Sequence, residues 1–167
     1  MVFKLWSEFL MHHLTKMKEV TDNEFGNGDQ SFQAAGGREG VRVLVDAFYD
    51  EMETDEQTAV ASVRQMHSPD LALSRDKLAV FLNAWLGGPR EYKDKYGSIS
   101  IPGFHARFDI DNSHRDAWLR CMTAAIAAQP YTEAFAEYLI TQLVVPANRV
   151  VQASAQRQEQ QRSDGES

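Results

Sequence analysis

The chemistry open to this chain depends on its histidines, because no familiar catalytic motif is present. The 167 residues contain no GxSxG, P-loop, HExxH or GxGxxG pattern, so standard hydrolase and nucleotide chemistry lose support. Of the five histidines, His12 and His13 are adjacent and cannot share one face of a helix. His114 lies in the polar first turn of an expected helix. We expect these three side chains to be solvated.

The two remaining histidines have surroundings in which an imidazole could bind a metal. His67 stands at a break between two expected helices, and His105 follows a loop and is flanked by Phe104 and Phe108. A single histidine beside aromatic rings is more often a structural residue than a ligand. From these neighbours alone, both interpretations stay open.

The net charge and the cysteine content exclude several classes of protein. The chain carries 17 basic and 24 acidic residues, a net charge of −7, which is the opposite of what nucleic acid binding requires and also disfavours anionic membranes. Its single cysteine, Cys121, cannot form an intramolecular disulfide. No CxxC or CxxCH motif indicates a zinc knuckle, a redox pair or covalent haem attachment. A reducing, intracellular compartment fits this composition.

The N-terminal segment is apolar but does not have the pattern of a signal peptide. Glu8, His12 and His13 interrupt the apolar run that a secretory signal requires, and no window approaches the roughly 20 apolar residues of a membrane span. The sequence therefore predicts a soluble, cytoplasmic protein. Residues 1–20 are expected to form an amphipathic helix, which packs on its own domain or binds a partner. Its apolar stripe consists of Phe3, Trp6, Phe9, Leu10, Leu14 and Met17.

Helical periodicity continues through the centre of the chain, and no segment alternates convincingly as a strand. A helix is expected over 38–53, with a capping box from Thr54 and Gln57 opening a short helix that ends near His67. The next helix is expected to have Ser68 as its N-cap and Pro69 at its first position, and its run from Asp70 is expected to end at the stop Gly87-Gly88-Pro89. The inner face of the 38–53 helix is expected to hold Val41, Leu44, Val45, Phe48 and Met52, with Tyr49 at its edge. The inner face of the helix from Asp70 is expected to hold Leu71, Ser74, Leu78, Phe81, Leu82 and Trp85.

The C-terminal part of the chain adds a long connection and two more helices. Residues 89–103 have no sustained period, and loops of this length are usually functional. Asp111 is expected to open a helix that ends at Pro130, and the last helix is expected from Thr132 to Pro146. We therefore predict an all-α domain over 31–147, after an N-terminal helix and linker in 1–30. The polar residues 148–167 are expected to form a disordered tail. The charged run 50–56 is expected to be a solvated face.

Three stretches of the sequence resemble the group II truncated haemoglobins, which have a two-over-two helical sandwich. They are FYDEM at 48–52, FLNAWLGGPREYKDKYG at 81–97 and HARFDIDNSHRDAWLRCM at 105–122. The last is the most specific, since the separation of 13 positions between His105 and Trp118 and the following Leu-Arg-Cys-Met match the family in spacing and identity. The resemblance spans about Phe32 to Ala128. It implies a truncated globin fold with the N-terminal helix as an addition.

The resemblance also implies roles for individual residues. The position of His105 resembles that of the family's proximal histidine, so it would bind the iron of a non-covalent haem b, while its second ring nitrogen donates to a backbone carbonyl. Tyr49 and Trp118 match the distal tyrosine and tryptophan that stabilise the ligand. The third distal position falls on His67 or, counted without a gap from Gly87, on Met66. An imidazole there could hydrogen-bond the ligand, relay a proton or bind the iron.

The rest of the pocket follows from the same resemblance and from helix facing. Ser74 matches a position that holds a histidine in many other globins, and a small residue there opens a route to the iron. Lys77 and Tyr92 are candidates for contacts with the haem propionates. The remaining expected pocket residues are Leu78, Phe81, Leu82, Phe104, Phe108 and Met122.

Three functions are compatible with this reading. The first is reversible binding of oxygen and of carbon monoxide, nitric oxide, cyanide or sulfide, with slow release that suits scavenging or redox chemistry better than oxygen transport. The second is a haem enzyme for nitric oxide dioxygenation or peroxide detoxification, which needs an external reductase and uses His67 as a proton relay. The third is a haem-free interaction module in which His105 is structural. A monomer and a homodimer are both open.

Overall fold

The structure, a computed structural model, describes residues 24–98 and 100–165. These residues form helices and no strand, which confirms the all-α prediction. The helices are α2 (Gln30–Ala34), α3 (Gly37–Thr54), α4 (Thr58–Gln65), α5 (Ala72–Trp85), α6 (Tyr92–Tyr96), α7 (Ile101–His105), α8 (Asn112–Ala127) and α9 (Glu133–Gly165). The expected N-terminal amphipathic helix lies outside the described residues and stays a prediction.

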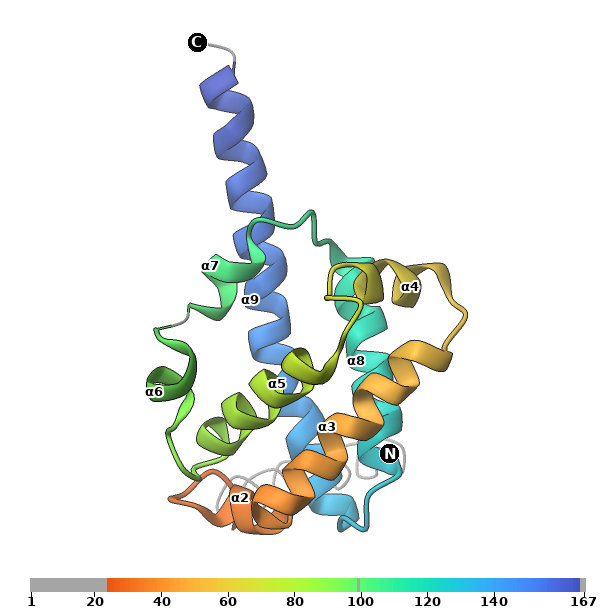
Figure 1. Cartoon of the computed structure of the whole chain (residues 1–167), viewed down its shortest axis with the longest axis vertical. Coiled ribbons are helices and arrows are strands. Elements are labelled where there is room, and N and C mark those ends of the chain that lie inside the picture. Colours follow the sequence, from red (N-terminus) through yellow and green to blue (C-terminus); the bar gives the residue numbers. More distant parts are fainter. Residues whose placement is uncertain (1–23, 99, 166–167) are drawn as a thin grey trace, which may run out of the picture.

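Four long helices form two layers, as the truncated globin prediction requires. The helix α3 packs against both α5 and α8, and α8 packs against α9. Figure 1 shows α3 and α5 crossing in front of α8 and α9. The inner face expected for α3 is buried throughout, and Tyr49 at its edge is buried as well. The short helices α4, α6 and α7 are attached to this frame and carry part of the candidate site.

The stop of α5 is where the sequence predicts it, and a glycine makes it possible. The helix ends at Trp85, and Gly87 has a φ of +93°. A Cβ at Gly87 would lie 1.9 Å from the carbonyl oxygen of Gly28. Because only glycine permits both this φ and this approach, the chain can turn away from α5 directly against the segment that precedes α2.

Two predicted helix starts are wrong in detail. Thr54 does not cap α4, since it is the last residue of α3 and its hydroxyl donates to the carbonyl of Asp50 at 3.0 Å. The turn before α4 is closed instead by Asp55, whose carboxylate accepts from the backbone N–H of Gln57 at 3.0 Å. A short polar side chain at a turn can bond either neighbouring backbone, and the sequence pattern does not decide which.

The start of α5 differs from the prediction for the same reason. The helix begins at Ala72 and not at Asp70, and Ser68 is not its cap. The carboxylate of Asp70 accepts from the N–H of Ala72 at 2.9 Å, so Asp70 belongs to the turn before the helix. The corner between α4 and α5 is therefore longer than expected, and it is the corner that contains His67.

The start of α8 is capped as expected, but its histidine is not solvated. The carboxylate of Asp111 accepts from the backbone N–H groups of Ser113 and His114. The hydroxyl of Ser113 also donates to this carboxylate at 2.6 Å, and this bond is the main cause that lowers the pKa of Asp111 to about 2. The ring of His114 reaches the hydroxyl of Ser62 on α4 at 2.9 Å. His114 is therefore a structural link between α4 and α8.

The long connection over 89–103 is not a bare loop. It contains α6 and most of α7, and His105 is the last residue of α7 instead of lying beyond a loop. Ser100 caps α7, since its side-chain oxygen accepts from the N–H of Gly103 at 3.2 Å. Helices this short have no room for a repeating apolar pattern, which explains why periodicity did not reveal them.

The last helix is much longer than the sequence pattern predicts. It continues through Pro146 to Gly165, so the expected stop at Pro146 is wrong and residues 148–165 are helical. Proline removes one backbone hydrogen bond, but the residues after it are mostly good helix formers, and Ser154 is completely buried against the domain. Figure 1 shows the end of α9 projecting beyond every other element. Within the described residues, no helix is both long and apolar enough to cross a membrane.

Candidate functional site

The geometry of His105 leaves one ring nitrogen available. Its Nδ1 lies 2.7 Å from the carbonyl oxygen of Ile101, four residues earlier, because side chains on a helix lean back toward the N-terminus. A carbonyl can only accept, so Nδ1 carries the proton and Nε2 of the neutral ring keeps its lone pair. Burial is the main cause that lowers the pKa of His105, and the charge of Arg107 adds to it. The neutral ring with a bare Nε2 is the form that binds a metal.

An aromatic ring lies against this imidazole, and a second lies beside the first. The ring of Phe104 lies edge-on to that of His105, with centroids 5.3 Å apart, and Phe108 lies 6.3 Å from Phe104. The guanidinium of Arg107 covers Phe104 at 3.9 Å and Phe108 at 4.9 Å. Phe104 nevertheless stays 43% exposed. Apolar surface therefore lies beside the free nitrogen of His105, and a flat, apolar group can pack against it.

His67 has the same internal geometry at the end of α4. Its Nδ1 lies 2.9 Å from the carbonyl oxygen of Val63, again four residues earlier. Burial is the main cause that lowers the pKa of His67, and the nearby charge of His105 lowers it further. The ring of His67 also lies edge-on to that of Tyr49, at 5.5 Å. These contacts place His67, at the α4–α5 corner, beside Tyr49 of α3.

Tyr49 on α3 is a buried phenol that keeps its proton. Its side chain is only 3% exposed, and burial raises its pKa to about 12 against smaller opposing effects of Arg75 and Ser74. Ser74 of α5 therefore lies near the phenol. Tyr49 is thus a neutral hydrogen-bond donor at neutral pH, and α3 and α5 together fix its position.

Trp118 on α8 lies beside the same part of α3. Its ring centroid is 5.2 Å from that of Phe48, which in turn is 4.9 Å from Tyr49. Phe48 is fully buried, whereas Trp118 keeps part of its surface exposed. Phe48 therefore works as a spacer that holds the indole and the phenol on one side of the molecule.

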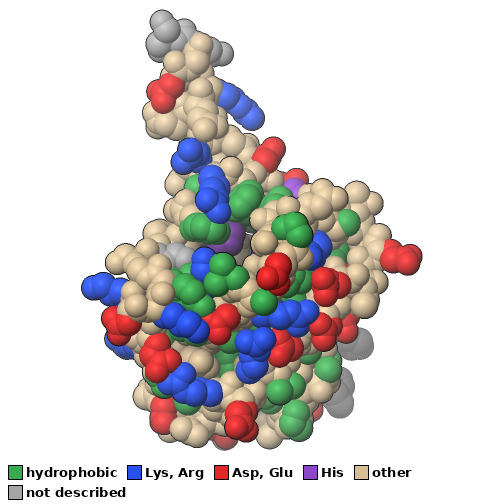
Figure 2. Space-filling model, viewed as in Figure 1, with side chains coloured by type: hydrophobic (Ala, Val, Ile, Leu, Met, Phe, Trp, Pro, Cys, Tyr) green, Lys and Arg blue, Asp and Glu red, His purple; other side chains and the backbone are tan. Residues whose placement is uncertain are grey.

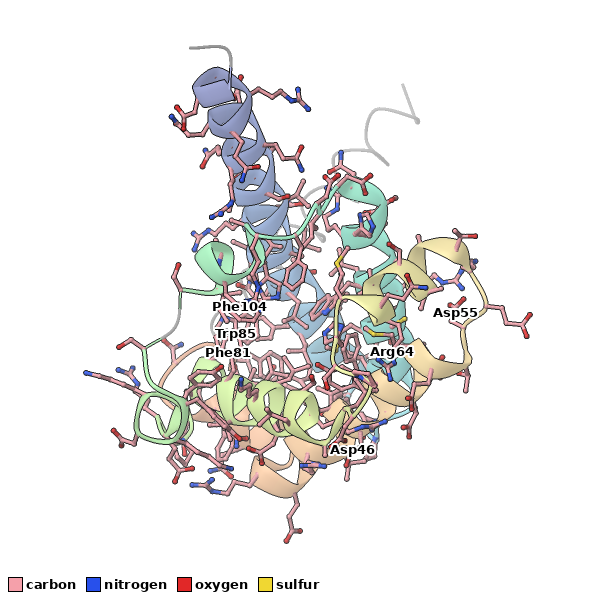
Figure 3. All side chains as sticks on the ribbon, turned by 45° about the horizontal axis from the view of Figure 1, so that its top comes forward. Asp46, Asp55, Arg64, Phe81, Trp85 and Phe104 are labelled. Atoms are coloured by element: carbon pink, nitrogen blue, oxygen red, sulfur yellow. The ribbon has the colours of Figure 1, made fainter. Side chains whose placement is uncertain are left out.

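The helix α5 buries a different set of residues from the one expected. Of the predicted inner face only Leu71 and Leu82 are buried, together with Ala79, Val80 and Asn83. The other predicted members are partly exposed: Ser74, Leu78, Phe81 and Trp85. Figure 2 shows hydrophobic side chains and a histidine around a hollow above α5. In Figure 3, Phe81 and Trp85 from α5 and Phe104 from α7 point into the region between these helices.

The remaining pocket candidates divide between surface and core. The ammonium of Lys77 lies 5.4 Å from the ring of Tyr96, and the ring of Tyr92 lies 5.3 Å from that of Tyr96. Both candidates for propionate contacts thus share one aromatic neighbour on α6. Met122 is completely buried between the layers.

Sequence reasoning missed an arginine that joins α5 to α3 beside Tyr49. Arg75 on α5 donates to the carbonyl of Asp46 at 2.8 Å and to the carboxylate of Asp50 at 2.6 Å, and lies 3.6 Å from that of Glu53. Its guanidinium also lies 5.5 Å from the ring centre of Tyr49. The spacing of four residues between Asp46 and Asp50 indicates that both lie on one face of a helix. It does not identify the residue of another helix that binds them.

A second arginine holds the corner that carries His67. Arg64 donates to the carbonyls of Ser68 and Pro69, both at 3.0 Å, and lies 3.4 Å from the carboxylate of Glu53. Figure 3 shows Arg64 and Asp46 on this side of the molecule, with Asp55 further out, where it pairs with Arg120. The acidic run over 50–56 is therefore largely exposed, as expected, but it also anchors cations from neighbouring helices.

Comparisons with known proteins agree with this arrangement. The family model described as Bacterial-like globin matches residues 30–150. The chain is 31% identical over 125 residues to group 2 truncated hemoglobin YjbI of Bacillus subtilis (strain 168), covering 73% of this chain and 91% of the relative. The chain therefore belongs to the bacterial-like globins and, within them, to the group II truncated haemoglobins.

Solved structures support the same family. A cold-adapted truncated hemoglobin from Pseudoalteromonas haloplanktis superposes with a TM-score of 0.68 at 29% identity, covering 72% of this chain and 96% of that one. A group II 2-on-2 hemoglobin from Agrobacterium tumefaciens superposes with a TM-score of 0.66 at 29% identity, covering 72% and 92%. The family model ends at residue 150, whereas α9 continues to Gly165.

Proposed function

We propose that this chain binds one non-covalent haem b through Nε2 of His105 and holds oxygen or a related small ligand on the opposite side. The observation that carries the proposal is a partly buried imidazole whose Nδ1 is bonded to the carbonyl of Ile101. This bond fixes the ring and leaves Nε2 as a neutral donor to a metal. Phe104 supplies apolar surface beside it, and membership of the globin family supports haem as the group that fits.

The bound haem supplies an iron centre that takes up one small ligand, such as oxygen, carbon monoxide, nitric oxide, cyanide or sulfide. The chain's own contribution is a set of polar groups opposite His105. Tyr49 keeps its proton and can donate to a ligand that carries partial negative charge, and Trp118 has an indole N–H of the same kind. A hydrogen bond to such a charge contributes about 1.5–3 kcal/mol. This favours slow release, and with it scavenging or redox chemistry.

His67 has a different role from Tyr49 and Trp118 in this proposal. Because Nδ1 of His67 is bonded to the carbonyl of Val63, the neutral ring presents a bare Nε2, which can accept a proton but cannot donate one. The distal side thus holds two donors and one acceptor. His67 would accept a proton or coordinate the metal itself, and it would not stabilise the ligand by donation.

Absorption spectra of the hemin-reconstituted protein test the central assignment. The wild type should show a Soret band in the ferric and ferrous states. His105→Gly should lose the five-coordinate histidine spectrum, and external imidazole should restore it by filling the space left by the side chain. His67→Ala should keep proximal ligation. A wild type without haem uptake, or a His105→Gly spectrum identical to the wild type, would contradict the proposal and favour a haem-free interaction module.

The bare Nε2 of His67 favours a second candidate function, which is catalysis of a reaction with hydrogen peroxide. A neutral, desolvated imidazole can take the proton of hydrogen peroxide as a general base, and such a group typically contributes about 10²–10⁴-fold to a rate. Turnover would need electrons from an external reductase or reducing substrate. The single cysteine and its composition support a reducing, intracellular setting for such a partner.

Peroxide-dependent oxidation of a reducing dye tests this second function. His67→Leu should lower the rate at least about 100-fold, because it removes the proton acceptor, while ligand binding in the ferrous state persists. Met66→Leu, a change at the neighbouring position, is the matched control and should leave the rate unchanged. Equal rates for the wild type and His67→Leu would rule out the proton-accepting role.

A further inference from the structure

The helix α7, which carries His105, rests on a single long helix. Among the described helices, α7 makes extensive contact with α9 and with no other. The segment that follows α7 is bonded by Ser154 and Gln158 of α9, and both lie beyond residue 150, where the family model ends. Part of the support of α7 therefore comes from a stretch of chain to which the family match does not extend.

Ser154 is the point where this stretch is fixed to the domain. Its side chain is 0% exposed, while most of the neighbouring residues on α9 are exposed. The hydroxyl donates to the carbonyl of Phe108 at 2.7 Å and accepts from the N–H of Ile110 at 2.9 Å. Both backbone groups belong to the segment between α7 and α8, where the N–H of Ile110 also donates to the carbonyl of Phe108 at 3.1 Å. A buried hydroxyl with both its donor and its acceptor engaged is a specific contact.

The hydrogen bonds continue from this segment to the axial histidine. The N–H of Phe108 donates to the carbonyl of His105 at 3.0 Å, and the carbonyl of Phe108 accepts from Ser154. Two consecutive hydrogen bonds thus join the backbone of His105 to α9. The ring of His105 is fixed separately by Ile101 within α7, so α7 and its following segment move together with the imidazole.

A second side chain reinforces the contact one turn further along α9. The amide of Gln158 donates to the carboxylate of Asp109 and lies 3.4 Å from the hydroxyl of Ser154. Ser154 and Gln158 are four residues apart and therefore share one face of the helix. Asp109 lies between the two backbone groups that Ser154 binds. The whole segment 108–110 is therefore held by this one face of α9.

We propose that the C-terminal half of α9 positions the axial ligand of the haem, and that Ser154 is the positioning residue that couples it to His105. This inference rests on the proposed function, since it assigns a role at the same site. Ser154 touches neither haem nor ligand. Its effect is to limit the tilt and translation of α7, and hence the direction from which Nε2 of His105 meets the metal.

The test compares Ser154→Ala with Ser163→Ala in the full-length, hemin-reconstituted protein. Ser163 is an exposed serine of the same helix whose hydroxyl donates to the carbonyl of Gln160, so the control makes the same chemical change without touching 108–110. The first measurement is the iron–histidine stretching frequency of the ferrous protein by resonance Raman spectroscopy. The second is amide hydrogen exchange of the peptide covering 101–110.

Ser154→Ala should shift and broaden the iron–histidine band and speed exchange in this peptide on the order of tenfold, while Ser163→Ala changes neither. A purely structural serine would lower stability without moving the band. If Ser154→Ala binds haem with the wild-type band and exchange rate, the inference is wrong and the proposed function stands. If the wild type takes up no haem, the proposed function fails and the inference fails with it.

Gln158→Leu keeps the test decisive if Ser154→Ala does not fold. Gln158 is only partly buried, so its replacement removes the link to Asp109 with little risk to the core. A smaller band shift in the same direction supports the positioning role. A band and exchange rate equal to those of the wild type overturn it.

Discussion

The two sides of the site are held by different kinds of interaction. On the side of Tyr49, which is the distal side in the proposed function, Arg75 joins α5 to the carboxylates of α3 and lies over the ring of Tyr49. On the side of His105, which is the proximal side in that proposal, α7 is held by packing on α9, and the segment after it by the neutral hydroxyl of Ser154. Ion pairs near the surface respond to salt and pH, whereas a buried neutral hydrogen bond does not. We therefore expect salt and pH to change the surroundings of Tyr49 while the position of His105 stays the same.

The largest expected effect on the distal side comes from Tyr49 itself. Tyr49→Phe removes a donor to the ligand worth about 1.5–3 kcal/mol, so oxygen release from the reduced protein should become roughly 10- to 100-fold faster. Stopped-flow release rates measure this directly. Tyr131→Phe is the matched control, since burial also raises the pKa of Tyr131 to about 12 but its hydroxyl faces the carbonyl of Ala35. Equal rates in both variants would remove Tyr49 from the site.

Removal of Arg75 should have the next largest effect, on stability and on ligand release together. Arg75→Met removes the hydrogen bonds to the carbonyl of Asp46 and to the carboxylate of Asp50, which should cost about 1–2 kcal/mol in the free energy of unfolding. Urea titration measures the loss. Arg42→Met, which breaks only an exposed pair with Asp46, should cost at most about 0.5 kcal/mol. Similar losses in both variants would show that Arg75 is an ordinary surface arginine.

Acid should weaken the fold through His67. Burial holds the pKa of His67 below its ordinary value, so the folded chain binds fewer protons there than the unfolded chain does. Above about pH 6.5, the pKa of an unperturbed histidine, His67 is neutral in both the folded and the unfolded chain and does not lower the free energy of unfolding. As the pH falls below this value, the unfolded chain takes up more protons at His67 than the folded chain, so the free energy of unfolding decreases. Between pH 7.5 and 5.5 the wild type should lose more stability than His67→Gln in urea titrations. Equal losses would mean that the His67 imidazole is freely solvated.

The smallest expected effect is a difference between the two sides of the site in how their contribution to stability responds to salt. At 1 M salt the screening length is about 3 Å, so the stability difference between the wild type and Arg75→Met should shrink. The difference between the wild type and Ser154→Ala should not change, because the Ser154 contact is buried and uncharged. Parallel urea titrations at low and high salt give both differences. A salt response at Ser154 equal to that at Arg75 would end the distinction between the two sides.

Much of the fold was predictable from the sequence because long helices leave a repeating pattern. The apolar face of α3, the glycine stop after α5 and the Asp111 cap of α8 are local features of chain geometry, and all are present. The prediction from sequence failed where a helix was too short or where a residue at a helix end had more than one possible partner. The helices α6 and α7 are too short for periodicity, and Thr54 and Asp70 had a choice of backbone partners that only the surrounding structure resolved.

The sequence predicts those residues of the candidate site whose side chains have a single evident chemical use. His105, Tyr49 and Trp118 could be named from their chemistry and from family spacing, but these roles stay predictions until the spectra are measured. The tautomer of His67 could not be foreseen, because it depends on whether the ring leans on the carbonyl of Val63. Arg75 was missed because its charged partners lie on another helix, 25 and 29 residues away.

By itself, then, the sequence determined the helical class, the family and the residue types available for binding, since these depend on local periodicity and on the identity of side chains. Only the tertiary structure decided that α9 passes through Pro146 and that Ser154 meets the backbone of 108–110. The physical reason is that a proline lowers helix stability by an amount that distant contacts can offset. Whether those contacts exist depends on where the chain brings α7, and no local pattern around residue 154 records this.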